Sequence, residues 1–181
     1  MRIILILIGI CAVTAADCQA SVHPSQVVEC RAITLTRQGV GSAFKGNIIN
    51  DDYAFSAKIP DDLTGWSGVA QGAPFHGFTI FLDSQGSACI YFEVHIRVEE
   101  KEAPGFPIGG REIHLGMAQG WQSIHEGSIG DLSFTNISTT FSFQRTNRKD
   151  DGVALLITPT VNLKKARAVY DNFINSLKFG Q

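Results

Sequence analysis

The strongest pattern of apolar and polar residues runs from Gly77 to Val98. Every second residue from Ile90 to Val98 is apolar and the intervening positions are mostly polar, which is typical of a half-buried β-strand. The even positions from Phe78 to Leu82 are apolar in the same way. Asp83 to Gly86 supplies turn-forming residues between the two runs, so the sequence predicts a β-hairpin here.

Weaker strand patterns occur on both sides of this hairpin. Glycine-rich residues 116–130 predict a turn or a short helical piece. The parity of the apolar residues changes near Asn136, which predicts a bulge or break in the strand there. A second hairpin is predicted from Phe141–Gln144 and Val153–Ile157, joined by a polar loop. Further short strands are expected at Arg31–Arg37, Tyr53–Ile59 and Arg111–Gly116.

The last segment has the spacing of an amphipathic helix. Apolar residues recur at steps of three and four from Leu163 to Leu177, with Asn162 as the expected N-cap and Gly180 as the expected C-terminal cap. One face of this helix must be buried. The predicted fold class is therefore α+β, with an antiparallel β-sheet packed on one face by a C-terminal amphipathic helix.

The N-terminus has the pattern of a secretory signal peptide. Met1-Arg2 precedes an apolar run from Ile3 to Val13, and small residues allow cleavage after Ala16 or after Ala20. Residues 1–20 are thus expected to be a signal peptide and residues 21–181 a single secreted domain. We expect no membrane segment after signal removal, because no second apolar run is long enough.

Cysteine pairing depends on the cleavage site. Cleavage after Ala20 leaves Cys30 and Cys89, which in an oxidising compartment are expected to form a disulfide. If cleavage leaves Cys18 in the mature chain, a bond between Cys18 and Cys30 competes. The alternative is that the cysteines are buried or free thiols without a bond.

Charge excludes one class of partner. The chain carries 15 Lys and Arg against 17 Asp and Glu, for a net charge of −2, so no basic surface for nucleic acid or anionic lipid is expected. Only the cluster at Arg145–Lys149 is basic, and because Asp150 and Asp151 follow at once it is interpreted as a solvated loop.

Two glycine- and proline-containing stretches, residues 65–77 and 99–110, are predicted to be surface loops, where binding residues are often found. They contain the candidate binding residues Trp66, Phe75, His76 and Phe106. The alternative is that the aromatic side chains fold back and cover the core.

Two short segments resemble a known family. The strand YAFSAKIP at residues 53–60 runs into a Pro-x-x-Leu-x-Gly-Trp turn, and the terminal helix ends in NSLKF at residues 175–179. In both respects the chain resembles the PsbP-like superfamily. The resemblance implies a small secreted or lumenal α+β domain with an accessory or binding role, and some secreted relatives look like immunity proteins that block a toxin.

Two Glu-x-His pairs are the sharpest candidates for chemistry. Glu93 and His95 share one face of a predicted strand, as do Glu112 and His114. If the two strands pair, two imidazoles and two carboxylates converge, and this set suits zinc or another divalent metal. The alternative is that these are ordinary polar residues on the solvated face of a sheet.

These observations predict a secreted or periplasmic, non-enzymatic binding or accessory protein, of which an immunity-type inhibitor is one form. It is expected to bind a protein partner and to need no cofactor. The alternative is a metal-dependent hydrolase that uses Glu93, His95, Glu112 and His114 with a divalent metal such as zinc.

Overall fold

A computed structural model describes residue 30 and residues 43–67, 76–96, 110–145 and 148–180. Within these residues an eight-stranded antiparallel sheet has the strand order β1-β4-β5-β6-β10-β9-β8-β7, and a three-stranded sheet has the order β11-β3-β2. The strands of the large sheet are β1 (Ala43–Phe44), β4 (Gly65–Trp66), β5 (Gly77–Phe81), β6 (Cys89–Ile96), β7 (Arg111–Leu115), β8 (Ala118–Ile129), β9 (Leu132–Gln144) and β10 (Lys149–Pro159). The small sheet contains β2 (Asn47–Asn50), β3 (Phe55–Lys58) and β11 (Lys178–Phe179).

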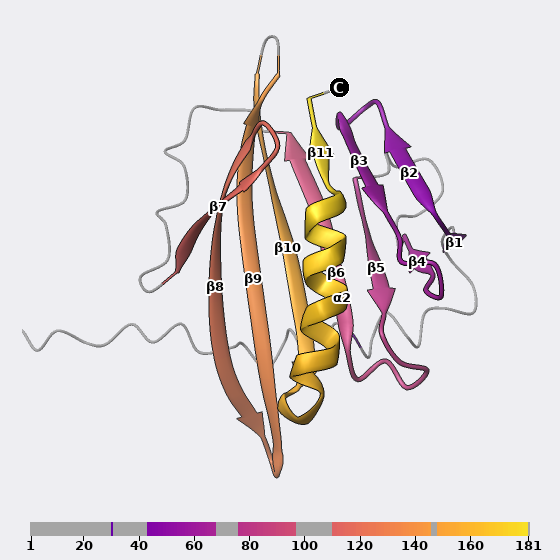
Figure 1. Ribbon diagram of the computed structural model, residues 1–181, viewed down its shortest axis with the longest axis vertical. Helices are drawn as coiled ribbons and strands as arrows, with labels where there is room; N and C mark the ends of the chain where they lie inside the picture. Colours follow the sequence, from indigo (N-terminus) through magenta and orange to yellow (C-terminus); the bar gives the residue numbers. More distant parts are fainter. Residues whose placement is uncertain (1–29, 31–42, 68–75, 97–109, 146–147, 181) are drawn as a thin grey trace, which may run out of the picture.

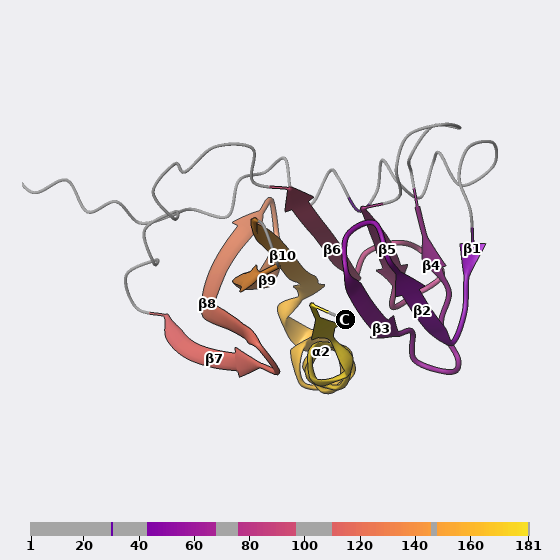
Figure 2. The same cartoon turned by 90° about the horizontal axis from the view of Figure 1, so that it is seen from above.

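A 3-10 turn, Thr160–Asn162, leads into the helix α2, Leu163–Ser176. Figure 2 shows that the large sheet is curved and that α2 and the small sheet lie on the same side of it. The helix presents Ala166, Tyr170, Phe173 and Ile174 to the core. The predicted α+β fold, with one terminal helix on one face of an antiparallel sheet, is confirmed.

Phe92 on β6 lies at the centre of the core between these two layers. Its ring is 5.0 Å from that of Phe55 in the small sheet, 5.2 Å from Phe78 on β5 and 5.6 Å from Phe173 on α2. The hairpin from Gly77 to Ile96 therefore contributes the inner face that sequence alternation predicted, and its register pairs Phe78 with Phe92.

Tyr170 joins the helix to the middle of the sheet. Its hydroxyl lies 2.8 Å from both Thr139 Oγ1 on β9 and Ala154 O on β10 and is hydrogen-bonded to both, and the side chain is fully buried. Burial raises the pKa of Tyr170, an effect that the hydrogen bond with Thr139 partly offsets. The phenol thus stays neutral and can serve as a fixed polar link in the core.

A second, smaller core lies on the opposite face of the large sheet. Phe134, Ile157 and Phe81 pack there around the disulfide between Cys30 and Cys89, whose Cα atoms are 6.2 Å apart. The pairing of Cys30 with Cys89 was predicted and is found. Because Phe134 belongs to this second core, β9 is buried on both faces near Asn136.

Three sequence predictions about the second half of the chain are wrong. The β8–β9 register is continuous from Gln119 to Ile129, so no bulge occurs at Asn136; the change of parity marks a change of face. Residues 118–129 form a 12-residue strand after a turn at Gly116, where φ is +63°, and not a turn or helical piece. The helix ends at Ser176, because residues 178–179 pair with β3, and Gly180 does not cap it.

Other predictions fall partly outside the described residues. The strand expected at residues 31–37 and the expected signal peptide at residues 1–20 both lie outside the described residues. None of the helices in the described part of the chain has the length and hydrophobicity needed to span a bilayer.

Candidate functional site

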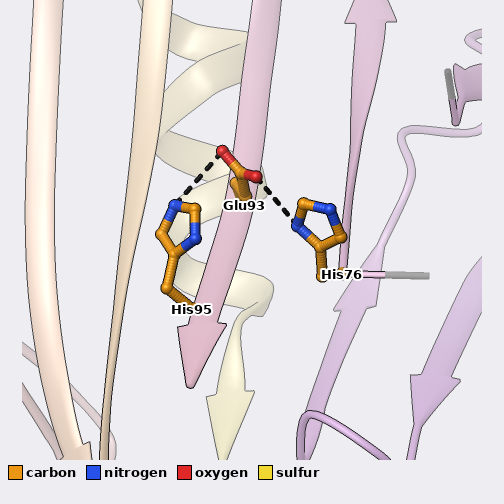
Figure 3. Close-up of side chains that lie close together, drawn as sticks. All are labelled: His76, Glu93 and His95. Carbon is orange, nitrogen blue, oxygen red and sulfur yellow. Dashed lines mark ion pairs between the residues drawn. The ribbon is translucent and has the colours of Figure 1, made fainter. Parts of the chain in front are cut away.

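Two histidines flank a glutamate whose side chain points to the outer face of the large sheet, away from α2. Strand β6 turns Phe92 and Val94 into the core, so Glu93 and His95 point to the opposite face. His76 lies immediately before β5, which pairs with β6 so that Gly77 is opposite Glu93. Figure 3 shows the two imidazole rings on either side of the Glu93 carboxylate.

The contacts within this group, which we call the His-Glu-His cluster (His76, Glu93 and His95), are close. His76 Nδ1 lies 2.8 Å from Glu93 Oε1, and His95 Nε2 lies 3.2 Å from Glu93 Oε2. The Tyr91 hydroxyl donates a hydrogen bond to the same Oε2 atom. Each carboxylate oxygen is thus engaged, and both histidines are held by the same glutamate.

The central glutamate of the cluster is the least exposed of the three side chains, and His95 is the most exposed. The side chain of Glu93 is 16% exposed, that of His76 is 35% exposed and that of His95 is 56% exposed. The ring of Tyr53 packs against His76 with a centroid distance of 5.8 Å. The carboxylate is therefore fixed in a partly dry environment, while the cluster remains open to solvent at His95.

The second Glu-x-His pair does not join the first. Glu112 and His114 lie on β7, and β10, β9 and β8 stand between β7 and β6. Four strand spacings of about 4.8 Å place the two pairs about 19 Å apart. Glu112 instead accepts a hydrogen bond from Gln119 Nε2 at 2.7 Å. The four-residue site required both strands to pair, and they do not.

The candidate binding residues lie in different parts of the chain. Trp66 packs against the second core. This aromatic side chain therefore covers the core, as the alternative interpretation of the loop predicted. His76 is part of the His-Glu-His cluster. Phe75 and Phe106 lie outside the described residues.

Sequence reasoning did not bring His76 together with Glu93, although both were candidates. The missing information was the register of the β5–β6 hairpin, which depends on how the turn after Phe81 is built. Asp83 Oδ1 accepts hydrogen bonds from the backbone N–H groups of Gln85 and Ser87 at 2.9 and 3.0 Å. This turn chemistry sets the register that places position 77 opposite position 93.

The basic cluster at 145–149 has a structural role that the sequence did not reveal. Arg148 Nε lies 3.0 Å from Asp150 Oδ1 and Arg145 Nη1 lies 3.6 Å from Asp150 Oδ2, and Asp150 is completely buried. Arg145 also donates to the backbone oxygen of Asp52 at 2.8 Å. The solvated-loop interpretation is wrong for these two arginines, which neutralise a buried carboxylate and tie the β9–β10 turn to the small sheet.

A cavity of about 490 Å³ lies at the start of α2, between the turns that follow β3 and β5. Two of its acidic side chains are already engaged: Asp61 is 3.3 Å from Lys58, and Asp83 accepts a bond from Ser87 Oγ at 2.6 Å. Burial tends to raise the pKa of Asp83, but the hydrogen bonds from Ser87, Gly86 and Gln85 lower it overall. This cavity lacks converging donors of the kind found in the His-Glu-His cluster.

Comparison with known proteins identifies a fold but no family. No protein-family model and no curated protein matches the chain. LpqN of Mycobacterium tuberculosis, described as involved in cell envelope biogenesis, has 12% identity and a TM-score of 0.54, over 77% of this chain and 92% of that chain. A protein from Bacteroides thetaiotaomicron has 11% identity and a TM-score of 0.49 over 76% of this chain, which spans only 49% of its length. The chain therefore resembles LpqN in fold.

Proposed function

We propose that this protein is a secreted or periplasmic binding or accessory protein of the cell envelope, which acts on a protein partner without catalysis. The fold likeness to LpqN supports an envelope role. The disulfide between Cys30 and Cys89 supports an oxidising compartment outside the cytoplasm, in agreement with the signal-like pattern of residues 1–20. An immunity-type inhibitor is one form of this function.

One observation supports our choice of the contact surface for the partner. Strand β4 ends at Trp66, β5 begins at Gly77 and β6 ends at Ile96. These strands are antiparallel neighbours, so all three of these ends lie at the same edge of the sheet. The first stretch predicted as a contact loop, residues 65–77, connects β4 to β5 at this edge, and the second, residues 99–110, follows the end of β6 there and leads to β7; residues 68–75 and 97–109 lie outside the described residues. We assign the contact surface to this edge, with His95 as its exposed marker.

A site-specific photo-crosslinker tests this assignment. The crosslinking residue is placed at position 95 in one variant and at position 114 in a matched control, since His114 is also an exposed histidine of the outer sheet face. Incubation with the envelope fraction of the source cells should yield one specific adduct from position 95 and none from position 114. The adduct partner is then purified and its affinity for the unmodified protein is measured.

Equal adducts from both positions, or no saturable binding of the purified partner, would reject the proposal. If the protein is an inhibitor, the purified partner must also lose its own activity when this protein binds. The metal-dependent hydrolase is not proposed, since its four residues lie in two separate places on the sheet.

A further inference from the structure

We propose that His76, Glu93 and His95 bind one divalent transition-metal ion, with zinc as the best fit. This inference goes beyond the proposed binding role and does not depend on it. The three residues each offer one ligand atom, and these atoms all lie within 4.8 Å of one another. Two imidazole nitrogens and one carboxylate oxygen form a donor set that proteins use for zinc.

The distances suit a tetrahedral ion after small side-chain rotations. Zn–N and Zn–O bonds of about 2.1 Å at tetrahedral angles separate neighbouring ligand atoms by about 3.4 Å. In the structure the two His–Glu contacts measure 2.8 and 3.2 Å. Metal binding would therefore widen these two contacts slightly and bring the more distant ligand atoms, which lie within 4.8 Å of one another, closer together, and the ion would replace the carboxylate as the group that both imidazoles face.

Strand pairing holds the backbone of two of the ligands, Glu93 and His95. Strand β6 is paired on both sides, with β5 and with β10, so Glu93 and His95 are fixed at the two-residue spacing of a strand. Gly77 lies opposite Glu93, and a Cβ at this position would be 2.2 Å from Phe92 O. The absence of a side chain there allows β5 to approach β6 closely and brings His76 to the carboxylate.

Two aromatic neighbours orient the ligands. Tyr91 donates to Glu93 Oε2, which leaves Oε1 on the side that faces His76 Nδ1. The ring of Tyr53, which belongs to the buried core, packs against the ring of His76. Metal-binding carboxylates and histidines are usually held in this way by surrounding groups, which reduces the entropy lost on binding.

The open side of the cluster provides entry and a free coordination position. His95 is more than half exposed, so an ion can reach the three donors from solvent. Three protein ligands leave at least one position for water or for a donor from another molecule. Nitrogen donors also select the metal, because magnesium and calcium prefer oxygen ligands alone.

Zinc titration of the purified mature protein, followed by competition with a chromophoric chelator, tests the site. We expect one zinc per chain and no competition from a large excess of magnesium. His76→Ala and His95→Ala should each lower the zinc affinity by at least about tenfold. The double variant Glu112→Gln/His114→Ala is the matched control, since it removes the same motif from the same sheet face, and should bind zinc like the unmodified protein.

A second measurement needs no variant. In the unmodified protein, zinc should shift the imidazole NMR signals of His76 and His95 and leave those of His114 and His125 in place. Stoichiometric binding with this pattern supports the site. The absence of saturable zinc binding, or an equal loss of affinity in the control variant, would overturn it.

Discussion

The two Glu-x-His pairs of the chain differ in their neighbours and not in their own geometry. Glu93 and His95 lie on the inner strand β6, whereas Glu112 and His114 lie on β7, the last strand of the sheet order. Both pairs are on the same outer face. Among the residues that the structure describes, only the first pair has a third donor, His76, which the register of β5 brings to it. A spacing of two on a strand thus supplies two donors, and the sheet register determines whether they become a cluster.

The largest expected effect is a loss of stability when the disulfide beside Glu93 and His95 is removed. The Cys30–Cys89 bond spans 59 residues and anchors β6 four residues before Glu93. Among the described residues, the β7–β9 part of the sheet contains no cysteine. Cys30→Ala/Cys89→Ala should lower the free energy of unfolding by about 4 kcal/mol, because the unfolded chain regains entropy. Urea unfolding measures this change, and a loss below about 1 kcal/mol would show that the bond does not constrain the chain as expected.

The next effect compares two glycines, one in each region. A Cβ at Gly77 meets backbone atoms, at 2.2 Å from Phe92 O, whereas a Cβ at Gly120 on β8 first meets the side chain of Ile113 at 3.0 Å. Gly77→Ala should cost about 3 kcal/mol, since the backbone of β6 must move, and Gly120→Ala about 1 kcal/mol or less. Thermal unfolding of both variants checks the difference. Equal losses would mean that the β5–β6 contact is not as close as described.

The smallest effect tests whether a third donor is all that the second pair lacks. Gln119 lies opposite His114 on β8 and already contacts Glu112. Gln119→His should therefore create a second zinc site, with an affinity gain of about tenfold over the unmodified β7 region, or about 1.4 kcal/mol. A titration that shows two zinc ions per chain confirms this. Gln119→Asn serves as the control, because it shortens the side chain without adding an imidazole, and it should bind one.

Sequence patterns predicted the parts of this fold in which one face carries large apolar residues. The β5–β6 hairpin and α2 are such elements, because Phe92 and Phe173 each follow the period of their element. Strand β8 was missed because its inward positions include Ala118, Gly120 and Gln122, which are too small or too polar to mark a core face. Phe134 was misread because it belongs to a second core on the other face.

The candidate site was predictable only in part. Strand alternation placed Glu93 and His95 on one outer face, and this prediction holds. The third member, His76, comes from a segment that the sequence indicates only as a loop. Its position depends on hydrogen bonds within the Asp83 turn and on the absence of a side chain at Gly77. Such long-range register is not visible in the local periodicity of the sequence.

The order of the strands also determines which strand edges the protein exposes to other copies of itself. The outermost strands of the large sheet are short, with two residues in β1 and five in β7, while β8 and β9 have 12 and 13 residues and lie inside it. Unpaired strand edges recruit strands from other chains, and charged residues discourage this. The charged residues Arg111 and Glu112 on β7 thus discourage strands of other chains from pairing at this edge, and β7 itself covers the edge of β8. A change that detaches β7 would expose the 12-residue edge of β8, at which chains can pair and aggregate.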